Sequence, residues 1–345
     1  MDMSTKLTRT ISASVPCRID FGGTLDITTF NLPMAHLKPA SFNIALDMRT
    51  HVTLSPHKSG WVKISSRGFE TAEFEQGRAP YDHPMGLMFA CAQYFNLHGI
   101  HIHIESTSPP KSALGGSSSA AVAILAAIFT ALEKEVDPLH LTWLAHYIES
   151  SVAGVPCGVQ DQAAAAFGGV NLWQWKMERT GPGFDRVPLY EKEEEVIALN
   201  SNILVAYCGI PHVSKNVNKQ WVDAFIQGDA RSHFEKIVQI TKKFHTALGD
   251  NDFSNAAHLM NQETRLRLEL TPDVLDKTGK KLFERAWQKN CGARFTGAGG
   301  GGCVWAVGES HDIEILKQEW QDVVSMVNDA AVLDTEIDSK GIVIL

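Results

Sequence analysis

Two carboxylates bracket a compact turn in the stretch ESSVAGVPCGVQDQ, residues 149–162. We expect Glu149 to lie on a helix and Asp161 to lie in the loop or helix start that follows the turn. Such a pair can divide the work of a reaction, because one carboxylate can hold a metal ion while the other accepts a proton. Two solvated surface acids would give the same pattern, and these residues alone favour that interpretation.

The stretch SPPKSALGGSSSAAVAILAAI, residues 108–128, places a small, hydroxyl-rich corner before an apolar helix. A helix N-terminus offers free backbone N–H groups and a partial positive charge, and glycine lets a ligand approach the backbone closely. Serine hydroxyls can cap the helix or bind a magnesium ion. These are the properties of a phosphate site, although a capped helix after a Pro-Pro turn is the alternative. The candidate phosphate ligands are Lys111, Gly115, Gly116, Ser117, Ser118 and Ser119.

Two further glycine-containing turns lie near opposite ends of the chain. In RIDFGGTLD, residues 18–26, Arg18 and Asp26 flank the turn. A buried arginine near Asp161 would hold that carboxylate ionised, whereas a surface ion pair is the alternative. In RFTGAGGGGCVWAV, residues 294–307, four consecutive glycines separate two apolar runs. Glycine between strands marks a close approach of another backbone or a ligand, or else a flexible hairpin tip.

Regular elements can be placed around these motifs from the hydrophobic periodicity. Alternation over residues 15–22 predicts a half-buried strand, with Ile19 and Phe21 on one face and Arg18 and Asp20 on the other. Further strands are predicted within 45–66, 99–106, 168–175, 203–209, 293–307 and 341–345. Helices are predicted near 118–135, 138–151, 215–248, 253–269, 277–290 and 311–325.

Four other features carry weaker signals. His101 and His103 share one strand face, which favours a polar face over a metal pair because no third ligand is nearby. For Trp173 and Trp175, packing inside the protein is a better interpretation than stacking on adenine. The polar loop 209–219 is a candidate lid over the substrate, with Ser214 as the N-cap of the helix that follows. Residues 260–270 either line a substrate pocket or form a solvated helix face.

Length and composition limit the class of protein. A chain of 345 residues exceeds the usual size of one hydrophobic core, so we expect two domains. The net charge of −8 disfavours a nucleic-acid partner. Six scattered cysteines without a C-x-x-C pair indicate reduced thiols, and no stretch predicts a signal peptide or a bilayer span. We therefore expect a cytoplasmic protein with no membrane partner.

Taken together and in this order, the motifs resemble those of the GHMP small-molecule kinases. RIDFGGTLD (18–26) resembles the substrate motif of that family, PKSALGGSSSA (110–120) its phosphate loop, and TGAGGGG (296–302) its late glycine motif. The resemblance spans most of the chain. It implies an ATP-dependent kinase that works with Mg²⁺, as a monomer or a homodimer.

The resemblance also implies roles for individual residues. ESSVAGVPCGVQDQ is similar to the galactokinase pattern E-x-x-x-x-G-x-x-C-G-x-x-D-Q, which makes Glu149 a magnesium ligand and Asp161 the catalytic base. Arg18 is similar to the arginine that steadies the base and the transferred phosphoryl group. Ser118 or Ser119 would be the second metal ligand, and the sequence of the loop does not distinguish between the two. The remaining implied contacts are Leu114 in the phosphate loop, Gly23, Thr24 and Asp26 for the substrate, and Gly297, Gly299, Gly300 and Gly301 in the late motif.

The first motif departs from galactokinases, because its loop is one residue shorter and the Glu-His pair is missing. It is nearer to the phosphoheptose kinases, which read R-I-S-F-G-G-G-G-T-D, and the shortened loop leaves the role of Asp26 open. Both relatives phosphorylate an anomeric hydroxyl, so the resemblance implies a kinase of a sugar or a sugar phosphate, heptose 7-phosphate or galactose-like. The alternatives are another GHMP substrate, such as mevalonate or homoserine, and a non-catalytic sugar sensor.

The family fold is a two-domain α+β fold. It implies an N-terminal α+β domain with a left-handed β-α-β phosphate loop over residues 1–185, and a ferredoxin-like C-terminal domain over residues 186–345. The terminal strand, residues 340–345, is expected to return to the first domain. The site is expected in the cleft between the two domains.

Overall fold

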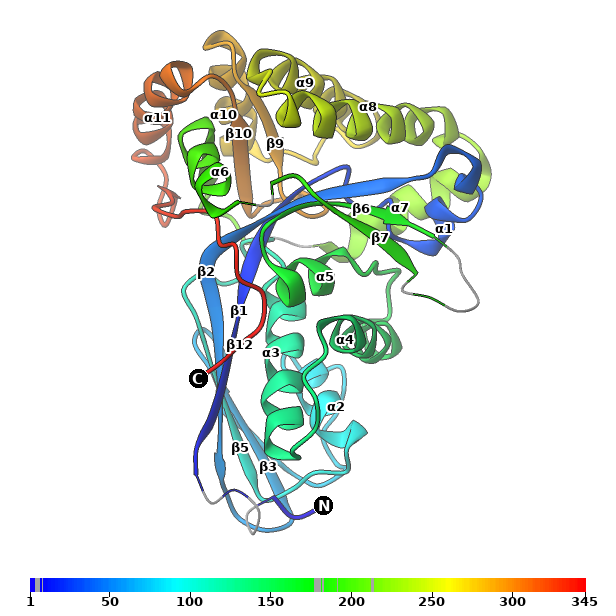
Figure 1. The fold of residues 1–345 in the computed structure, drawn as a ribbon, viewed down its shortest axis with the longest axis vertical. Helices are drawn as coiled ribbons and strands as arrows, with labels where there is room; N and C mark the ends of the chain where they lie inside the picture. Colours follow the sequence, from blue (N-terminus) through cyan, green and yellow to red (C-terminus); the bar gives the residue numbers. More distant parts are fainter. Residues whose placement is uncertain (4–6, 8, 177–180, 182, 191, 212–213) are drawn as a thin grey trace.

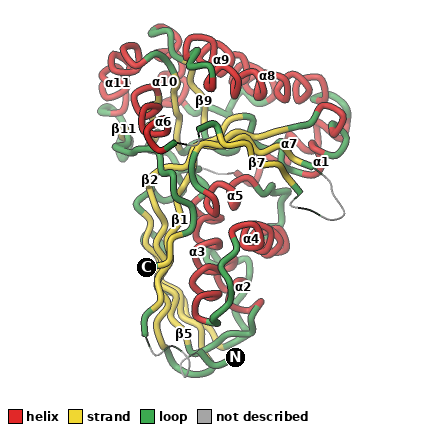
Figure 2. The backbone as a smooth tube through the Cα atoms, in the orientation of Figure 1, coloured by secondary structure: helices red, strands yellow, loops and turns green. Residues whose placement is uncertain are grey.

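The fold is known from a computed structural model, which describes residues 1–3, 7, 9–176, 181, 183–190, 192–211 and 214–345. Figures 1 and 2 show two β-sheets with helices against each. The strand GIVIL at the C-terminus lies on the first sheet, beside the strand nearest the N-terminus. The chain has a two-domain, mixed α+β architecture.

The first sheet has eight strands, which follow the path β12-β1-β2-β5-β3-β4, with β6 paired to β2 and β7 paired to β6. The long strand β2 organises this sheet, because it pairs with β1, β5 and β6. The strands are β1 (Ile11–Phe21), β2 (Ala40–Pro56), β3 (Trp61–Ser66), β4 (Ala72–Glu75), β5 (Ile100–Ser106), β6 (Val170–Trp175), β7 (Phe184–Pro188) and β12 (Val343–Ile344).

Helices cover one face of this sheet, with α3 packed directly on β1 and β2. Helix α3 is rich in alanine, and twelve of its residues are buried, so it forms the centre of the first core. Alanine favours the helix and permits close packing against the sheet. The helices here are α2 (Gly86–Tyr94), α3 (Gly116–Ala131), α4 (Pro138–Val152) and α5 (Gln160–Phe167). Asp137 caps α4 by accepting from the backbone N–H groups of Leu139 and His140.

The second sheet has four strands in the order β11-β8-β10-β9. Its strands are β8 (Ile203–Tyr207), β9 (Gly292–Phe295), β10 (Cys303–Val307) and β11 (Ala331–Val332). The α-helices of this half, several of which pack on the sheet, are α6 (Glu193–Ala198), α7 (Ser214–Gln227), α8 (Arg231–Gly249), α9 (Phe253–Leu270), α10 (Lys277–Gln288) and α11 (Ser310–Val324). Short helices α1 (Thr28–Asn31), η1 (Ala35–Leu37) and η2 (Leu199–Asn202) complete the fold.

A C-terminal segment ties the two sheets together. After β11 the chain forms a bridge between Ile337 and Leu46 of β2, and β12 then pairs with β1. The side chain of Arg49 forms an ion pair with Asp338 along this path. Strand β7 pairs with β6 in the first sheet, whereas β8 belongs to the second. The domain boundary at residue 185 stays a prediction.

Two expectations about secondary structure were wrong. Strand β1 is not half-buried, because Arg18 and Asp20 are 3% and 0% exposed and face charged groups inside the protein. The single helix predicted over 215–248 is two helices, α7 and α8, which are separated at Gly228. The φ of Gly228 is 103°, a conformation that no helix can continue through.

The loop 209–219 is only partly described. Helix α7 begins at Ser214, but residues 212 and 213 and the side chains of 214–216 lie outside the described part of the chain. The predicted lid and the predicted N-cap of Ser214 lie outside the described residues.

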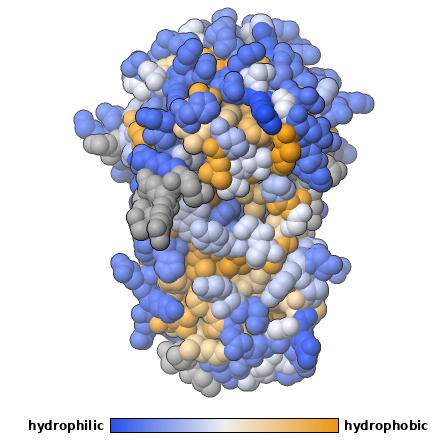
Figure 3. Space-filling view, turned by 90° about the vertical axis from the view of Figure 1, so that its right-hand side faces the viewer, coloured by the Kyte–Doolittle hydropathy of each residue, from blue (hydrophilic) through white to orange (hydrophobic). Residues whose placement is uncertain are grey.

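None of the helices in the described part of the chain is long and apolar enough to cross a membrane. Figure 3 shows a largely hydrophilic upper surface, with apolar residues gathered in patches lower on that face.

Candidate active site

The phosphate-loop candidates lie where the chain enters α3. Gly115 is the N-cap of α3 and has a φ of 77°, so glycine suits this position. Lys111 and Ala113 also have positive φ values, of 56° and 63°. The loop is anchored on β1, because the backbone N–H of Arg18 donates to the carbonyl of Leu114 at 3.1 Å. The sequence therefore builds a tight turn that opens directly into the N-terminus of a buried helix.

Arg18 and Asp161 form an ion pair beside this turn. Both Nε and Nη2 of Arg18 lie 2.8 Å from Oδ1 of Asp161, and Nη1 donates to the carbonyl of Ala113 at 2.8 Å. A Cβ added to Gly115 would lie 3.6 Å from both side chains, so the pair lies against the phosphate loop. Burial opposes the charge of Arg18, but Asp161 and Asp20 outweigh it and raise the pKa of the guanidinium.

Glu149 lies near the start of α3, facing Ser118. Its Oε2 accepts from the hydroxyl of Ser118 at 2.7 Å and from Nε2 of Gln162 at 2.6 Å. Desolvation by burial raises the pKa of Glu149 to about 7, and the charge of Asp161 adds to this rise. Ser119 points elsewhere, because its hydroxyl donates to the carbonyl of Pro16 at 3.2 Å. The structure thus separates the two serines that the sequence left equivalent.

Asp26 lies close to Asp161 in space. Its Oδ2 accepts from the backbone N–H of Gln160 at 2.9 Å, whereas Oδ1 is buried and has no hydrogen-bond partner. Burial raises the pKa of Asp26 to about 7, and the charge of Asp161 contributes. A Cβ on Gly158 would lie 1.7 Å from Oδ2, so the loop before α5 closes on Asp26 only because this residue is glycine.

The glycines of the late motif contact two different parts of the protein. The backbone N–H of Gly297 donates to Oδ1 of Asp20 at 2.6 Å, and an added Cβ on this glycine would lie 3.7 Å from Arg18. Gly302 lies directly against the carbonyl of Ser112 in the phosphate loop. The glycines between them, Gly299, Gly300 and Gly301, pack against Val274 and the carbonyls of Ile210 and Pro211. The motif therefore serves close backbone approach, in part to the phosphate loop.

The remaining candidates lie around these contacts. Lys111 and Ser117 are exposed at the rim of the turn, where a hydrogen bond from Ser117 partly offsets the rise that burial causes in the pKa of Glu149, and Gly116 has open space where a Cβ would be. The predicted substrate residues Gly23 and Thr24 are contacted from inside the protein by Arg267, at 2.7 and 3.2 Å.

Sequence reasoning did not predict that four charged residues are buried together next to the site. They are Asp20, Glu263, Arg267 and Arg294, and each is 0% exposed. The solvated-face interpretation of residues 260–270 is wrong for Glu263 and Arg267. Their spacing of four along a helix was a signal for a pair, but nothing local showed that the pair is buried.

The histidines and tryptophans that carried weaker signals in the sequence have ordinary structural roles. His101 and His103 both contact the hydroxyl of Ser65, at 2.7 and 2.8 Å, on the polar face of β5. The described residues contain no cluster of three or more His, Cys, Asp or Glu side chains that could hold a metal ion. Trp173 and Trp175 are buried and pack with Phe184, as expected.

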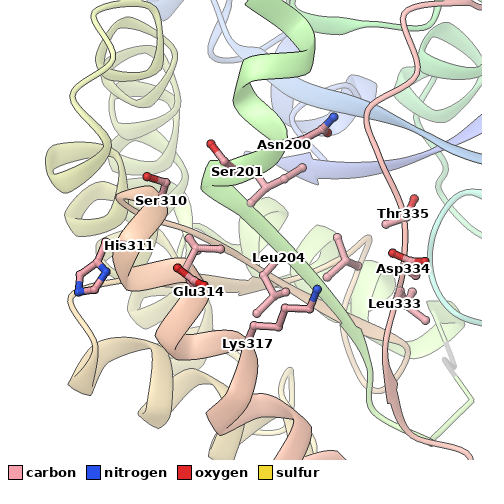
Figure 4. Close-up of a pocket in the computed structure, with 13 residues that line it drawn as sticks. Asn200, Ser201, Leu204, Ser310, His311, Glu314, Lys317, Leu333, Asp334 and Thr335 are labelled. Carbon is pink, nitrogen blue, oxygen red and sulfur yellow. The ribbon is translucent and has the colours of Figure 1, made fainter.

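A separate hollow of about 480 Å³ lies in the second half of the molecule (Figure 4). Strand β8, helix α11 and the segment after β11 form it, with Lys317, Glu314 and Asp334 among its lining residues. None of the residues of the Arg18–Asp161 site lines it, so it is no part of that site.

The chain is similar to known proteins over most of its length. The model for the GHMP kinases N terminal domain matches residues 84–169, and the model for the GHMP kinases C terminal matches residues 244–325. A mevalonate kinase of Thermococcus onnurineus is 26% identical, over 81% of this chain and 85% of its own length. The D-glycero-alpha-D-manno-heptose 7-phosphate kinase of Campylobacter jejuni is 24% identical, over 86% and 89%.

Solved structures show the same fold. The galactokinase of Lactococcus lactis, in complex with galactose, superposes with a TM-score of 0.75 at 17% identity, over 99% of this chain and 98% of its own. A glycine turn at a helix N-terminus, an arginine–aspartate pair beside it and both matched domains lie in one chain. The protein is a phosphotransferase of the GHMP kinase family.

Proposed function

We propose that the protein transfers the γ-phosphoryl group of ATP to the anomeric hydroxyl of a sugar or a sugar phosphate, with heptose 7-phosphate or a galactose-like sugar as the candidates. The contact between Arg18 and Asp161 beside Gly115 carries the proposal. It holds a carboxylate next to a phosphate loop, where an acceptor hydroxyl and the γ-phosphorus would meet. GHMP kinases use ATP, and the phosphates would lie over residues 115–119.

Mg²⁺ fits the residues near the start of α3. The hydroxyl of Ser118 and the carboxylate of Glu149 are oxygen donors of the kind that Mg²⁺ prefers, and they lie 2.7 Å apart. The two groups would hold the ion next to the phosphates. When bound, Mg²⁺ offsets the negative charge of the β- and γ-phosphates.

Asp161 is the proposed general base. Its carboxylate would accept the proton of the sugar hydroxyl as the hydroxyl oxygen bonds to the γ-phosphorus. The bond from the γ-phosphorus to the bridging oxygen breaks at the same time, and ADP leaves. Arg18 would orient Asp161, because it makes two contacts with one carboxylate oxygen.

Asp26 supports a sugar as the acceptor. Its Oδ1 is a buried hydrogen-bond acceptor without a partner, close to Asp161. A sugar has a hydroxyl on a carbon next to the reacting one and can donate a hydrogen bond there. Mevalonate and homoserine have a methylene group at that position. The names of the heptose kinase and galactokinase relatives agree with a sugar, whereas the mevalonate kinase relatives keep mevalonate as the second candidate.

A coupled assay of ADP release over a panel of acceptors tests the proposal. The panel contains hexoses, heptoses and their terminal phosphates, with mevalonate and homoserine as the competing acceptors. We expect ADP release with at least one sugar or sugar phosphate and a 1-phosphate product. Release only with mevalonate or homoserine would contradict the proposal. Sugar binding without ADP release would instead indicate a sensor.

A further inference from the structure

A cluster of four buried charges joins the two halves of the molecule. Asp20 belongs to β1, Glu263 and Arg267 belong to α9, and Arg294 belongs to β9. Each side chain is fully shielded from solvent. Taking ionised groups out of water is costly unless they are paired, so the pairs within the cluster define its geometry.

Glu263 is the centre of this charge cluster. Its Oε2 accepts from Nε of Arg294 at 2.9 Å, and its Oε1 accepts from Nε of Arg267 at 2.8 Å. Burial by itself would raise the pKa of Glu263, but the two arginines outweigh burial and lower it. Two negative and two positive charges therefore balance inside the protein.

One chain of ion pairs, here called the first arm of the cluster, runs from Glu263 to the proposed catalytic pair of Arg18 and Asp161. Nη1 of Arg294 lies 3.1 Å from Oδ2 of Asp20. The other oxygen of Asp20 accepts from the backbone N–H of Gly297 and lies 3.5 Å from Nη1 of Arg18. Arg18 in turn contacts Asp161, so this arm links Glu263 to the proposed base through four ion pairs.

The other arm reaches the substrate turn. Nη2 of Arg267 donates to the carbonyl of Gly23 at 2.7 Å, and Nη1 donates to the hydroxyl of Thr24 at 3.2 Å. These residues lead directly to Asp26, whose free carboxylate oxygen is the proposed contact to the acceptor. Arg267 thus fixes the backbone of the turn from inside the protein, without a contact to the proposed acceptor position.

We infer that Glu263 is a positioning residue for the reaction, which orients Arg18 through Arg294 and Asp20 and orients the turn before Asp26 through Arg267. The inference rests on the proposed function, because it takes Asp161 as the base and Asp26 as the acceptor contact. A cluster that served stability alone would have no reason to end at these two places. Its two arms should therefore have separate kinetic signatures.

Arginine-to-lysine variants test the two arms. Lysine retains the positive charge but lacks the planar fork that binds two partners at once. A misplacement on the order of 1 Å at a reacting group costs about 100-fold in rate. We expect Arg294→Lys to lower kcat by about 10- to 100-fold while the acceptor KM changes by less than about threefold. We expect Arg267→Lys to raise the acceptor KM by about tenfold while kcat changes by less than about threefold.

Milder variants extend the test if a lysine variant does not fold. Asp20→Asn keeps the shape of the first arm, and Thr24→Val removes only the hydroxyl that Arg267 reaches. We expect the same two signatures at a smaller size. Arg265→Lys is the matched control, because Arg265 lies on α9 but is exposed, over the ring of Trp287. Its kinetics should equal those of the wild type.

The wild-type acceptor panel tests the proposed function, and the split between the two arms tests the positioning. The variants are measured with whichever acceptor the wild type phosphorylates, so a mevalonate result would refute the sugar proposal and still permit the second test. Thermal unfolding of each variant confirms that it is folded at the assay temperature. If both arms change kcat and KM in the same ratio, or if neither arm changes them, the positioning role is wrong.

Discussion

The guanidinium of Arg18 and the carboxylate of Asp161 lie 143 positions apart in the sequence and meet at 2.8 Å. Arg18 comes from β1 and Asp161 from the first turn of α5, so the contact depends on how the helix packs against the sheet. Gly115 lies in contact range of both side chains. The candidate phosphate loop, the cation and the carboxylate therefore form one unit.

Replacing Asp161 by asparagine should remove most turnover. The amide has nearly the same shape but accepts no proton, and removal of a general base costs on the order of 10²- to 10⁴-fold in rate. ATP binding, measured by calorimetry, should stay close to that of the wild type. Asp229→Asn, in the exposed turn between α7 and α8, is the control and should be fully active. A kcat near normal for Asp161→Asn would reject its role as the base.

Ser118 and Ser119 should differ in their effect on magnesium. Ser118→Ala removes the hydroxyl that contacts Glu149, so we expect the Mg²⁺ concentration for half-maximal activity to rise by about 10- to 100-fold. Ser119→Ala should leave this concentration unchanged, because its hydroxyl contacts the carbonyl of Pro16. The loss of that buried hydrogen bond should instead lower the free energy of unfolding by about 1 kcal/mol. The reverse pattern would exchange the two roles.

Gly116→Ala separates nucleotide binding from stability. A Cβ at this position meets no atom within 4 Å, and alanine favours a helix by about 0.5–1 kcal/mol over glycine. We therefore expect the melting temperature to stay the same or rise. If the phosphates of ATP approach this backbone, the methyl group should weaken ATP binding by about tenfold or more, which is about 1.4 kcal/mol. Unchanged ATP affinity, measured by calorimetry, would show that the phosphates do not approach Gly116.

Asp26 makes stability depend on pH in a defined direction. Its pKa is about 7 in the folded protein and 3.8 in its ordinary state. The folded state thus binds the proton more tightly, and the free energy of unfolding should fall as the pH rises from about 4 to about 7. At pH 8 the buried, ionised carboxylate lowers the free energy of unfolding, so Asp26→Asn should be more stable than the wild type by about 1–3 kcal/mol.

Urea unfolding of both proteins at pH 5 and pH 8 measures this effect. The advantage of the Asp26→Asn variant should shrink at pH 5, because the wild-type carboxyl is then mostly protonated in the folded state. Glu149, whose pKa is also raised to about 7, titrates in both proteins and cancels in the comparison. A variant that is less stable than the wild type at pH 8 would show that the buried charge of Asp26 is well compensated.

Several parts of the fold and site could be predicted from the sequence because the signals are local. The helix after the phosphate loop follows from an alanine-rich, apolar run, and it begins at Gly116, two residues before the expected start. The strand over residues 99–106 follows from strict alternation, and β5 lies there. The glycine turns mark the places where backbones approach each other, as Gly302 does at Ser112.

Only the tertiary structure decided which of these residues meet. Ser118 and Ser119 are neighbours in the sequence, but one residue of an α-helix turns by about 100°, so the first contacts Glu149 and the second contacts β1. In the sequence, Glu263 and Arg267 fit a solvated helix face as well as a pocket lining, yet they are buried together with Arg294 against Asp20. Burial and pairing depend on how distant elements pack, and no local pattern of residues encodes that.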